Sequence, residues 1–183
     1  MIVAAFSTNE TYEKMARDLA ASVEAFGYEC MLFKCEDTGA WTRNVNHKPT
    51  VIKSALMAAA GDSVFYIDAD ARMVQKPTLI PSDEWDVAVY YDTPTRPCGG
   101  SMWFHSLERC GALVDDWIAN VAAAPESADD WINFKAALDK HKPRILHLPP
   151  SYNYHKPTMR SRFPGAKPVI EHYCSGIHNY QVY

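Results

Sequence analysis

Hydrophobic positions recur along the chain with two periods, which predicts strands that alternate with helices. Short apolar runs of the kind found in buried strands lie at 2–6, 29–34, 64–67, 87–91, 101–104, 145–148 and 169–170. Apolar residues at helical spacing predict helices over 12–26, 51–59, 107–121 and 130–138. This order is typical of an α/β fold whose sheet is parallel at least in its first half.

The segments between these elements are expected to lack regular structure. The polar stretch 42–48 is interpreted as a loop, and Gly99 and Gly100 as a turn that enters the next strand. Beyond Pro149 the chain is expected to be irregular and aromatic, apart from its last short strand. Leu32, in the second strand, is expected to be buried.

Composition limits the classes of protein that the chain can represent. The length of 183 residues suits one domain with a real core, and 48% apolar residues with 22% charged residues exclude disorder. A net charge of −4 gives no global basic field for nucleic acid or membrane. The apolar runs are far shorter than the roughly 20 residues of a membrane span, and the N-terminus does not have the pattern of a signal peptide. We therefore expect a soluble cytoplasmic protein.

The five cysteines are scattered along the chain without a CxxC pair. A disulfide framework or a structural zinc site would need closer, paired spacing. We expect most of these cysteines to be small buried hydrophobes.

The clearest chemical signal is the pair Asp68 and Asp70, which follows the apolar strand 64–67. Residues two apart on an extended segment point the same way, and strand ends of open α/β sheets bind ligands. Two converging carboxylates repel each other unless a cation lies between them, so this pair favours an Mg²⁺ or Mn²⁺ site. The alternative is a polar strand end with both carboxylates in water.

This segment resembles the Asp-x-Asp metal motif of GT-A glycosyltransferases. Upstream, Lys48 and Pro49 precede an apolar helix and the sequence Tyr-Ile-Asp-Ala-Asp-Ala, as in nucleotide-diphospho-sugar transferases of this fold. Weaker matches follow at 99–101, 129–131, 148–153 and 170–172, so the resemblance covers nearly the whole chain. It implies a single GT-A (Rossmann-like) domain over 1–183, with a mixed sheet flanked by helices. Residues 1–100 would bind the nucleotide-sugar, and 101–183 would form the acceptor side.

The resemblance also implies an activity of the hexosyltransferase type. Such an enzyme uses Mn²⁺ or Mg²⁺ to move a sugar from a nucleotide-diphospho-sugar, here expected to be a UDP-sugar, to an acceptor. The acceptor is open among a glycan, a lipid, a protein, a small molecule and a nucleic-acid base. Because the chain is short for this fold, its acceptor-binding part is expected to be reduced to the loops after Pro149.

The metal ligands implied by the resemblance are Asp70, Asp68 and His172. Asp70 matches the residue that usually binds the metal directly, and Asp68 would contact either the metal or the ribose. His172 occupies the place of a late histidine that often completes the metal shell. The alternative is that His172 is an ordinary polar histidine.

A further group would bind the donor. In the fold that the resemblance implies, the end of the first strand, here Ser7 and Thr8, holds the base and ribose, and a basic residue, here Lys48, lies near the diphosphate. We expect Tyr12 to stack on a base and Arg72 to approach the phosphates or the acidic pair. Gly99 and Gly100 would let the backbone approach the sugar closely. The alternatives are that the segment 7–9 only caps a helix, that Tyr12 lies in the core, that Lys48 is a solvated surface residue and that the glycines form an ordinary turn.

Asp129 and Asp130 are the candidate catalytic residues, with Asp130 favoured. In the resembling family an acidic residue at the start of this helix faces the donor sugar or the acceptor hydroxyl. It would be the general base if the reaction inverts the anomeric centre, and it would position the sugar if the reaction retains it. The alternative is that Ser127 and the two aspartates form a helix cap.

The segment 155–167 carries Lys156, Arg160, Arg162 and Lys167 without an acidic residue. On an acidic chain so short a basic patch is weak evidence for nucleic-acid binding. We favour a solvated loop or a flap over the diphosphate.

Three other functions compete with the glycosyltransferase. A haloacid-dehalogenase-like phosphatase also uses Asp-x-Asp, but it expects Thr or Val where Arg72 stands. A sugar nucleotidylyltransferase would open with a Gly-rich loop, and the segment 5–9 contains no glycine. A non-catalytic nucleotide-sugar-binding module would keep Asp68 and Asp70 without turnover, and analogy of fold does not separate it from an enzyme.

Overall fold

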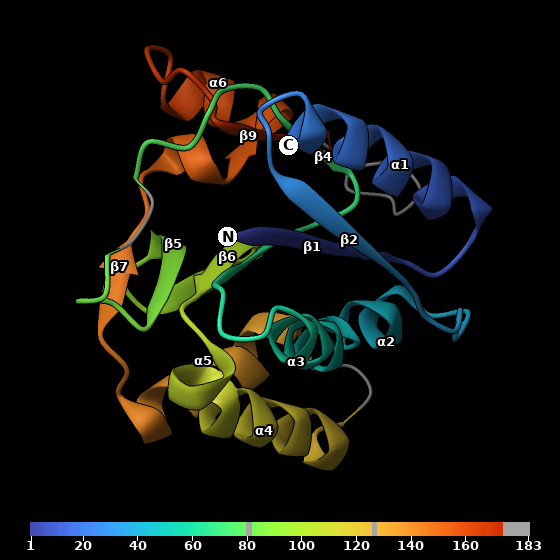
Figure 1. Ribbon diagram of the computed structural model, residues 1–183, viewed down its shortest axis with the longest axis vertical. Coiled ribbons are helices and arrows are strands. Elements are labelled where there is room, and N and C mark those ends of the chain that lie inside the picture. Colours follow the sequence, from blue (N-terminus) through green and yellow to red (C-terminus); the bar gives the residue numbers. More distant parts are fainter. Residues whose placement is uncertain (80–81, 126–127, 174–183) are drawn as a thin grey trace.

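A central mixed sheet organises the protein, which we describe from a computed structural model for residues 1–79, 82–125 and 128–173. The sheet has six strands in the order β2-β1-β3-β6-β5-β7 (Figure 1). Their bounds are β1 Ile2–Ser7, β2 Glu29–Lys34, β3 Val64–Ile67, β5 Val87–Thr93, β6 Arg96–Phe104 and β7 Ile145–His147. The first strand runs parallel to β2 and β3, as predicted, whereas β6 is antiparallel to both β3 and β5.

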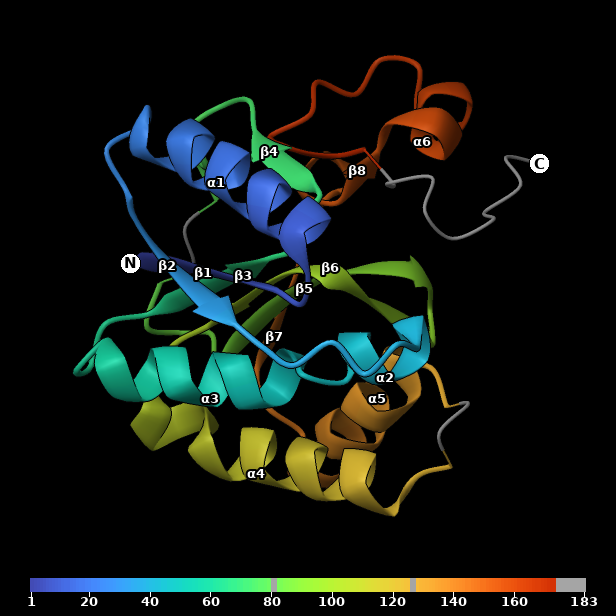
Figure 2. The same ribbon diagram turned by 90° about the vertical axis from the view of Figure 1, so that its right-hand side faces the viewer.

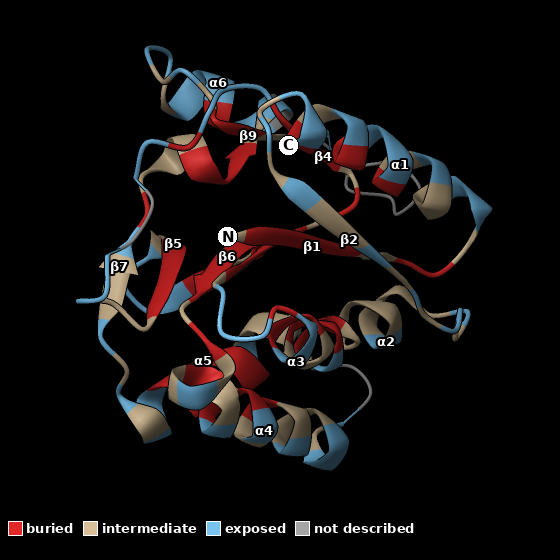
Figure 3. Ribbon diagram, in the orientation of Figure 1, coloured by how far each residue is buried: buried red, intermediate tan, exposed pale blue. Residues whose placement is uncertain are grey.

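Helices cover both faces of this sheet. One face carries α3 (Lys48–Ala58), α4 (Leu107–Ala123) and α5 (Asp130–His141), and the other carries α1 (Glu10–Glu24) (Figures 1 and 2). The alternation of strand side chains divides the core accordingly. Val64 and Tyr66 pack with the α3–α5 side, whereas Phe65 and Ile67 pack with the α1 side. Figure 3 shows the central strands buried and the outer surfaces of the helices exposed.

A second, three-stranded sheet lies on the α1 side, in the order β4-β9-β8. Its strands are β4 (Ala71–Met73), β8 (Tyr154–His155) and β9 (Ile170–His172). Ala71 pairs with His172 in the antiparallel β4–β9 ladder, and His155 pairs with His172 in the parallel β8–β9 ladder. The small sheet therefore places the late segment of the chain directly beside the residues that follow β3.

The loop predicted at 42–48 is wrong, because most of it belongs to the helices α2 (Trp41–Val45) and α3. The glycine turn is also wrong, since Gly99 and Gly100 lie inside β6, which begins at Arg96. The chain after Pro149 is more regular than expected, with a 3₁₀ turn at Pro150–Tyr152, β8 and α6 (Lys156–Arg162) before β9.

Burial departs from expectation at the sheet edge. Leu32 is 43% exposed because β2 is an edge strand, so its burial was wrongly predicted. Cys110 is buried, whereas Cys30, Cys35 and Cys98 are half-buried and free. Cys174 lies outside the described residues. Across the described ranges, none of the helices has the length and apolar character needed to cross a bilayer.

Candidate metal and nucleotide-sugar site

A pocket of about 630 Å³ opens where β1 and β3 end. Ser7 is the last residue of β1, and Asp68 directly follows β3. Carboxyl ends of parallel strands meet at one edge of a sheet, which is why both lie in the same wall. The far side of the pocket is formed by residues of β5, β6, β8 and α6, among them Asp92, Arg96 and His155.

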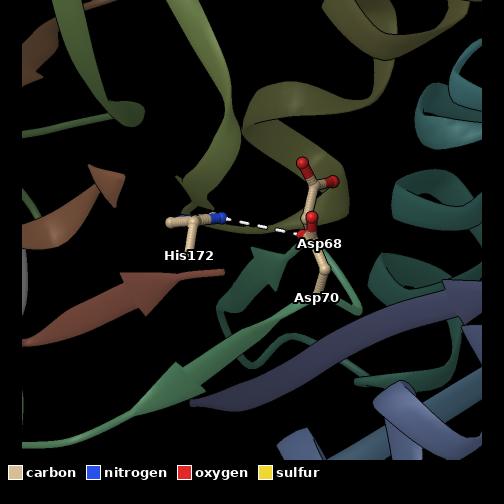
Figure 4. Close-up of side chains that lie close together, drawn as sticks. All are labelled: Asp68, Asp70 and His172. Atoms are coloured by element: carbon tan, nitrogen blue, oxygen red, sulfur yellow. Dashed lines mark ion pairs between the residues drawn. The ribbon is translucent and has the colours of Figure 1, made fainter. Parts of the chain in front are cut away.

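Asp68, Asp70 and His172 come together as predicted, and of the three Asp68 and Asp70 line the pocket. One ligand atom of each lies within 4.8 Å of the others. His172 Nδ1 is 4.0 Å from Asp70 Oδ1, along the dashed line in Figure 4. The pairing of Ala71 with His172 brings this histidine to the acidic pair across 100 residues of sequence.

The environment of His172 favours a ligand rather than an ordinary polar histidine. The side chain is 1% exposed, and its Nε2 lies 3.0 Å from Ser101 Oγ. Burial, with His155 stacked on the ring, lowers the pKa of His172 well below 6.5, so the ring is neutral. With Nε2 protonated toward Ser101, Nδ1 offers a lone pair on the side of Asp70. Nδ1 accepts no hydrogen bond from any described residue.

This donor set fits a divalent cation. Carboxylate oxygens suit Mg²⁺ and Mn²⁺, and an imidazole nitrogen shifts the preference toward a transition metal such as Mn²⁺. The buried, unpaired Nδ1 is the observation that supports the fit, because a buried polar atom without a partner is costly.

Lys48 connects the acidic pair to the start of α5. It is 4% exposed, so it is not a solvated surface lysine. Its Nζ lies 2.7 Å from Asp130 Oδ2, 3.2 Å from Asp68 Oδ1 and 3.3 Å from the Gly99 carbonyl oxygen. Burial alone would lower the pKa of Lys48, but Asp130 and Asp68 outweigh it and raise the pKa above 10.5. The lysine is therefore charged.

Opposing effects act on the pKa of Asp68. Burial raises the pKa of this carboxyl to about 6; Lys48 and a hydrogen bond from Tyr66 oppose the rise, and Asp70 adds to it. The Tyr66 hydroxyl donates to Asp68 Oδ1 at 2.7 Å. A cation that binds next to this carboxyl would therefore favour its ionised form and release its proton.

The residues predicted for the base and ribose lie in the same pocket. Ser7, Thr8 and Tyr12 all line it. The helix-capping role that was the alternative belongs to Asn9, whose side chain accepts a hydrogen bond from the Tyr12 backbone N–H at 3.2 Å. The segment 7–9 therefore caps α1 and also lines the pocket.

Arg72 departs from its predicted place near the phosphates or the acidic pair. Its guanidinium lies 2.8 Å from Asp18 Oδ2 on α1 and also donates to the Met15 carbonyl oxygen. The alternation of β4 turns Arg72 away from the side on which Ala71 and Met73 are buried. It does not line the pocket.

Gly99 and Gly100 make room for side chains and do not themselves line the pocket, which corrects their predicted role. A Cβ on Gly99 would lie 2.9 Å from Asp130 Oδ2, and one on Gly100 would lie 2.6 Å from Asn153 Oδ1. Neither distance is tolerated between real atoms, so a larger residue would displace the site side chains.

The two candidate catalytic aspartates differ in their contacts. Asp130 is held by Lys48 next to the acidic pair, whereas Asp129 accepts a hydrogen bond from the Trp131 indole at 3.1 Å. Asp129 is the N-cap of α5, but its side chain caps no backbone N–H. Ser127, the third member of the predicted cap, lies outside the described residues. Neither aspartate lines the pocket directly.

Sequence reasoning missed several residues of the pocket wall. Trp41 and Asn44 belong to α2, in the stretch taken for a loop. The absence of glycine and proline from 41–45 was the available signal. Asn153, at the end of the 3₁₀ turn, also lines the pocket and had been assigned no role.

The basic segment 155–167 is not a solvated loop. It contains α6, from which Thr158, Met159 and Arg162 line the pocket. Arg162 forms an ion pair with Asp92 and donates to its carbonyl oxygen at 3.1 Å. This contact joins α6 to the end of β5 beside the pocket. A flap over the diphosphate stays a prediction.

No family model matches the sequence, and no curated protein matches it. Solved structures do match. A glycosyltransferase involved in the glycosylation of the major capsid of PBCV-1 superposes with a TM-score of 0.75 at 11% identity, covering 95% of this chain and 92% of that one.

The glycosyltransferase GlyE of Streptococcus pneumoniae TIGR4 gives TM-scores of 0.63 for its apo form and 0.61 for a second structure, at 13% and 14% identity. These matches cover 95% and 96% of this chain, which spans about half of GlyE, 54% and 55% of it. The six-stranded mixed sheet flanked by helices is thus the fold of these glycosyltransferases, and the predicted α/β fold of GT-A type is confirmed.

Proposed function

We propose that this protein is a metal-dependent glycosyltransferase that moves a sugar from a nucleotide-diphospho-sugar, a UDP-sugar, to an acceptor. The observation that carries the proposal is the convergence of Asp68, Asp70 and the buried His172 within 4.8 Å, beside a 630 Å³ pocket that Asp68 and Asp70 line. The glycosyltransferase structures that share the fold support it. They do not favour the phosphatase or the binding module.

In this proposal Asp68, Asp70 and His172 hold Mn²⁺ or Mg²⁺. A bound divalent cation would neutralise the charge that develops on the departing nucleoside diphosphate. Ser7, Thr8 and Tyr12 would contact the base and ribose, because they line the pocket near its β1 side. The assignment of 1–100 to the donor and 101–183 to the acceptor stays a prediction, as does the identity of the acceptor.

Lys48 takes a different part from the predicted contact with the diphosphate. Its ammonium group contacts the carboxylates of Asp68 and Asp130 and the carbonyl oxygen of Gly99. It would act as a positioning residue that holds the two carboxylates next to each other. Because Lys48 ties Asp130 and not Asp129 to the acidic pair, Asp130 is the proposed catalytic carboxylate. Either role, general base or sugar-positioning group, is compatible with this place.

Calorimetric titration tests the donor class. UDP, GDP and their hexoses are titrated into the protein with Mn²⁺ and again with EDTA, and release of UDP from each UDP-hexose is followed with candidate acceptors. We expect UDP to bind only when Mn²⁺ is present. Binding of no nucleotide by a folded protein would contradict the proposal, and binding without any turnover would favour the non-catalytic module.

A pair of variants locates the metal. Asp70→Ala should lose metal-dependent UDP binding without unfolding, because the variant removes a ligand and also a like charge near Asp68. Asp115→Ala is the matched control, because this aspartate is on α4, 53% exposed and paired with Lys53, away from the pocket. Unchanged UDP affinity in Asp70→Ala would refute the metal assignment.

A further inference from the structure

Asn153 is a fully buried asparagine in the lining of the pocket. It lies between the 3₁₀ turn Pro150–Tyr152 and β8, is 0% exposed and lines the pocket. Its backbone N–H donates to the Pro150 carbonyl oxygen at 3.1 Å. Within the described part of the chain, neither Nδ2 nor Oδ1 of its side chain forms a hydrogen bond. Folding buries such a group only at a cost comparable with a lost hydrogen bond, so its partner is to be sought in a ligand.

The surroundings of this amide indicate which ligand. A Cβ on Gly100 would meet Asn153 Oδ1 at 2.6 Å and His172 Cε1 at 2.8 Å, so both side chains approach the same point of β6. His172 Nδ1, bonded to that Cε1, is the other unpaired polar atom here and faces Asp70. Asn153 therefore lies beside His172 at β6 and shares the lining of the pocket with Asp68 and Asp70.

We propose that Asn153 belongs to the metal centre and that its carboxamide oxygen binds the cation or one of its waters. This inference rests on the metal site of the proposed function. An amide oxygen is a ligand that Mg²⁺ and Mn²⁺ accept, and an octahedral cation needs six donors where Asp68, Asp70 and His172 supply three. A neutral amide adds a donor without more negative charge.

Titration with Mn²⁺ alone tests the inference, with free Mn²⁺ followed by its electron paramagnetic resonance signal. Asn153→Ala should weaken Mn²⁺ binding about tenfold, as loss of an outer-shell partner typically does. Asn153→Asp, which keeps an oxygen at the same place, should bind at least as well as the wild type. Asn133→Ala is the matched control, because Asn133 is also a buried asparagine with an unpaired Nδ2 but does not line the pocket. It should bind Mn²⁺ like the wild type.

A second pair of variants tests the same site by adding a methyl group at a glycine. Gly100→Ala should weaken Mn²⁺ binding as Asn153→Ala does, because the new methyl group collides with Asn153 and His172. Gly111→Ala in α4 is its control, since a Cβ there lies an ordinary 3.4 Å from Leu107 Cδ1. Circular dichroism and the thermal shift caused by Mn²⁺ separate a metal effect from a loss of fold.

Three outcomes would overturn the inference. Equal Mn²⁺ affinity in wild type and Asn153→Ala overturns the inference while the proposed function stands. Unchanged Mn²⁺ affinity with weakened UDP-hexose binding also overturns it and assigns the amide to a sugar hydroxyl. If the wild-type protein itself binds no Mn²⁺, the proposed metal site fails, and the inference fails with it.

Discussion

Two clusters of charged side chains lie at different places along β6 and differ in their charge balance. At the Phe104 end, the carboxylate of Asp86 accepts a hydrogen bond from Arg109 Nε at 2.7 Å. The same carboxylate accepts the Arg144 backbone N–H at 2.8 Å, and the Arg144 guanidinium lies 3.3 Å away. One negative charge thus meets two positive charges, and the carboxylate is well satisfied.

The Lys48 cluster, beside Gly99 in the middle of β6, has the opposite balance. Asp68 and Asp130 share one ammonium group, that of Lys48, and Asp70, near Asp68, lies 4.0 Å from a neutral histidine. Burial and Asp70 raise the pKa of Asp68 to about 6, although Lys48 opposes the rise. The charges of the Asp86 cluster are thus balanced by protein groups, whereas the Lys48 cluster keeps an excess of negative charge that the proposed cation would offset.

The largest effect on stability is expected from Asp86→Ala. This change leaves two guanidinium groups without their carboxylate, of which only Arg144 is well exposed, and should lower the free energy of unfolding by about 3 kcal/mol. Mn²⁺ affinity should not change, because Asp86 lies near the Phe104 end of β6 and does not line the pocket. Urea denaturation measures the loss of stability, and Mn²⁺ titration measures the affinity. A change in Mn²⁺ affinity would show that the Asp86 cluster also affects the metal site.

Lys48→Met should lower the free energy of unfolding in EDTA by about 2 kcal/mol, because Asp68 and Asp130 lose their shared cation. Mn²⁺ should recover part of this loss, since a ligand that binds only the folded state stabilises it. Urea denaturation with EDTA and with Mn²⁺ measures the recovery against the wild type. An equal response of variant and wild type to Mn²⁺ would show that Lys48 does not balance the acidic cluster.

The pH dependence follows from Asp68. In metal-free protein its pKa, raised to about 6 by burial, exceeds the ordinary value of 3.8, so the carboxyl adds stability that is complete below pH 3.8 and lost as the pH rises through 6. Mn²⁺ binding needs the ionised carboxylate, so its affinity should instead rise by about tenfold from pH 5 to pH 7. Mn²⁺ titrations at both pH values measure this rise, and a flat profile would contradict it.

The pattern of the sequence predicted the fold and the centre of the site well. The buried strand 64–67 and the aspartates after it are local features, and the two carboxylates do come together. The extended segment expected to align them is instead a turn, in which the Ala71 N–H donates to the Asp68 carbonyl oxygen. His172 came from resemblance to GT-A enzymes, because no local signal could reveal its pairing with Ala71 in the small sheet.

The remaining site could not be predicted because it depends on contacts between distant segments. Gly100 matters through Asn153 and His172, which follow it by more than 50 residues and meet it only after the small sheet has formed. Arg72 lies next to the acidic motif in sequence, but on β4 its side chain points away from the pocket and forms an ion pair with Asp18. Sequence proximity therefore predicted the backbone better than the partners of long side chains.

The smallest effect should come from Tyr66→Phe, which removes one hydroxyl from the Lys48 cluster and keeps the buried ring. The hydroxyl donates to Asp68 Oδ1 at 2.7 Å and favours the ionised carboxyl, so its loss should raise the pKa of Asp68. At pH 6 the proton then competes better with Mn²⁺, and affinity should fall by about threefold, within the roughly 1 kcal/mol of one hydrogen bond. At pH 8 the carboxyl is ionised in both proteins, and the affinities should agree. Mn²⁺ titrations at the two pH values measure the difference, and an equal loss at both would mean that Tyr66 orients Asp68 without affecting its ionisation.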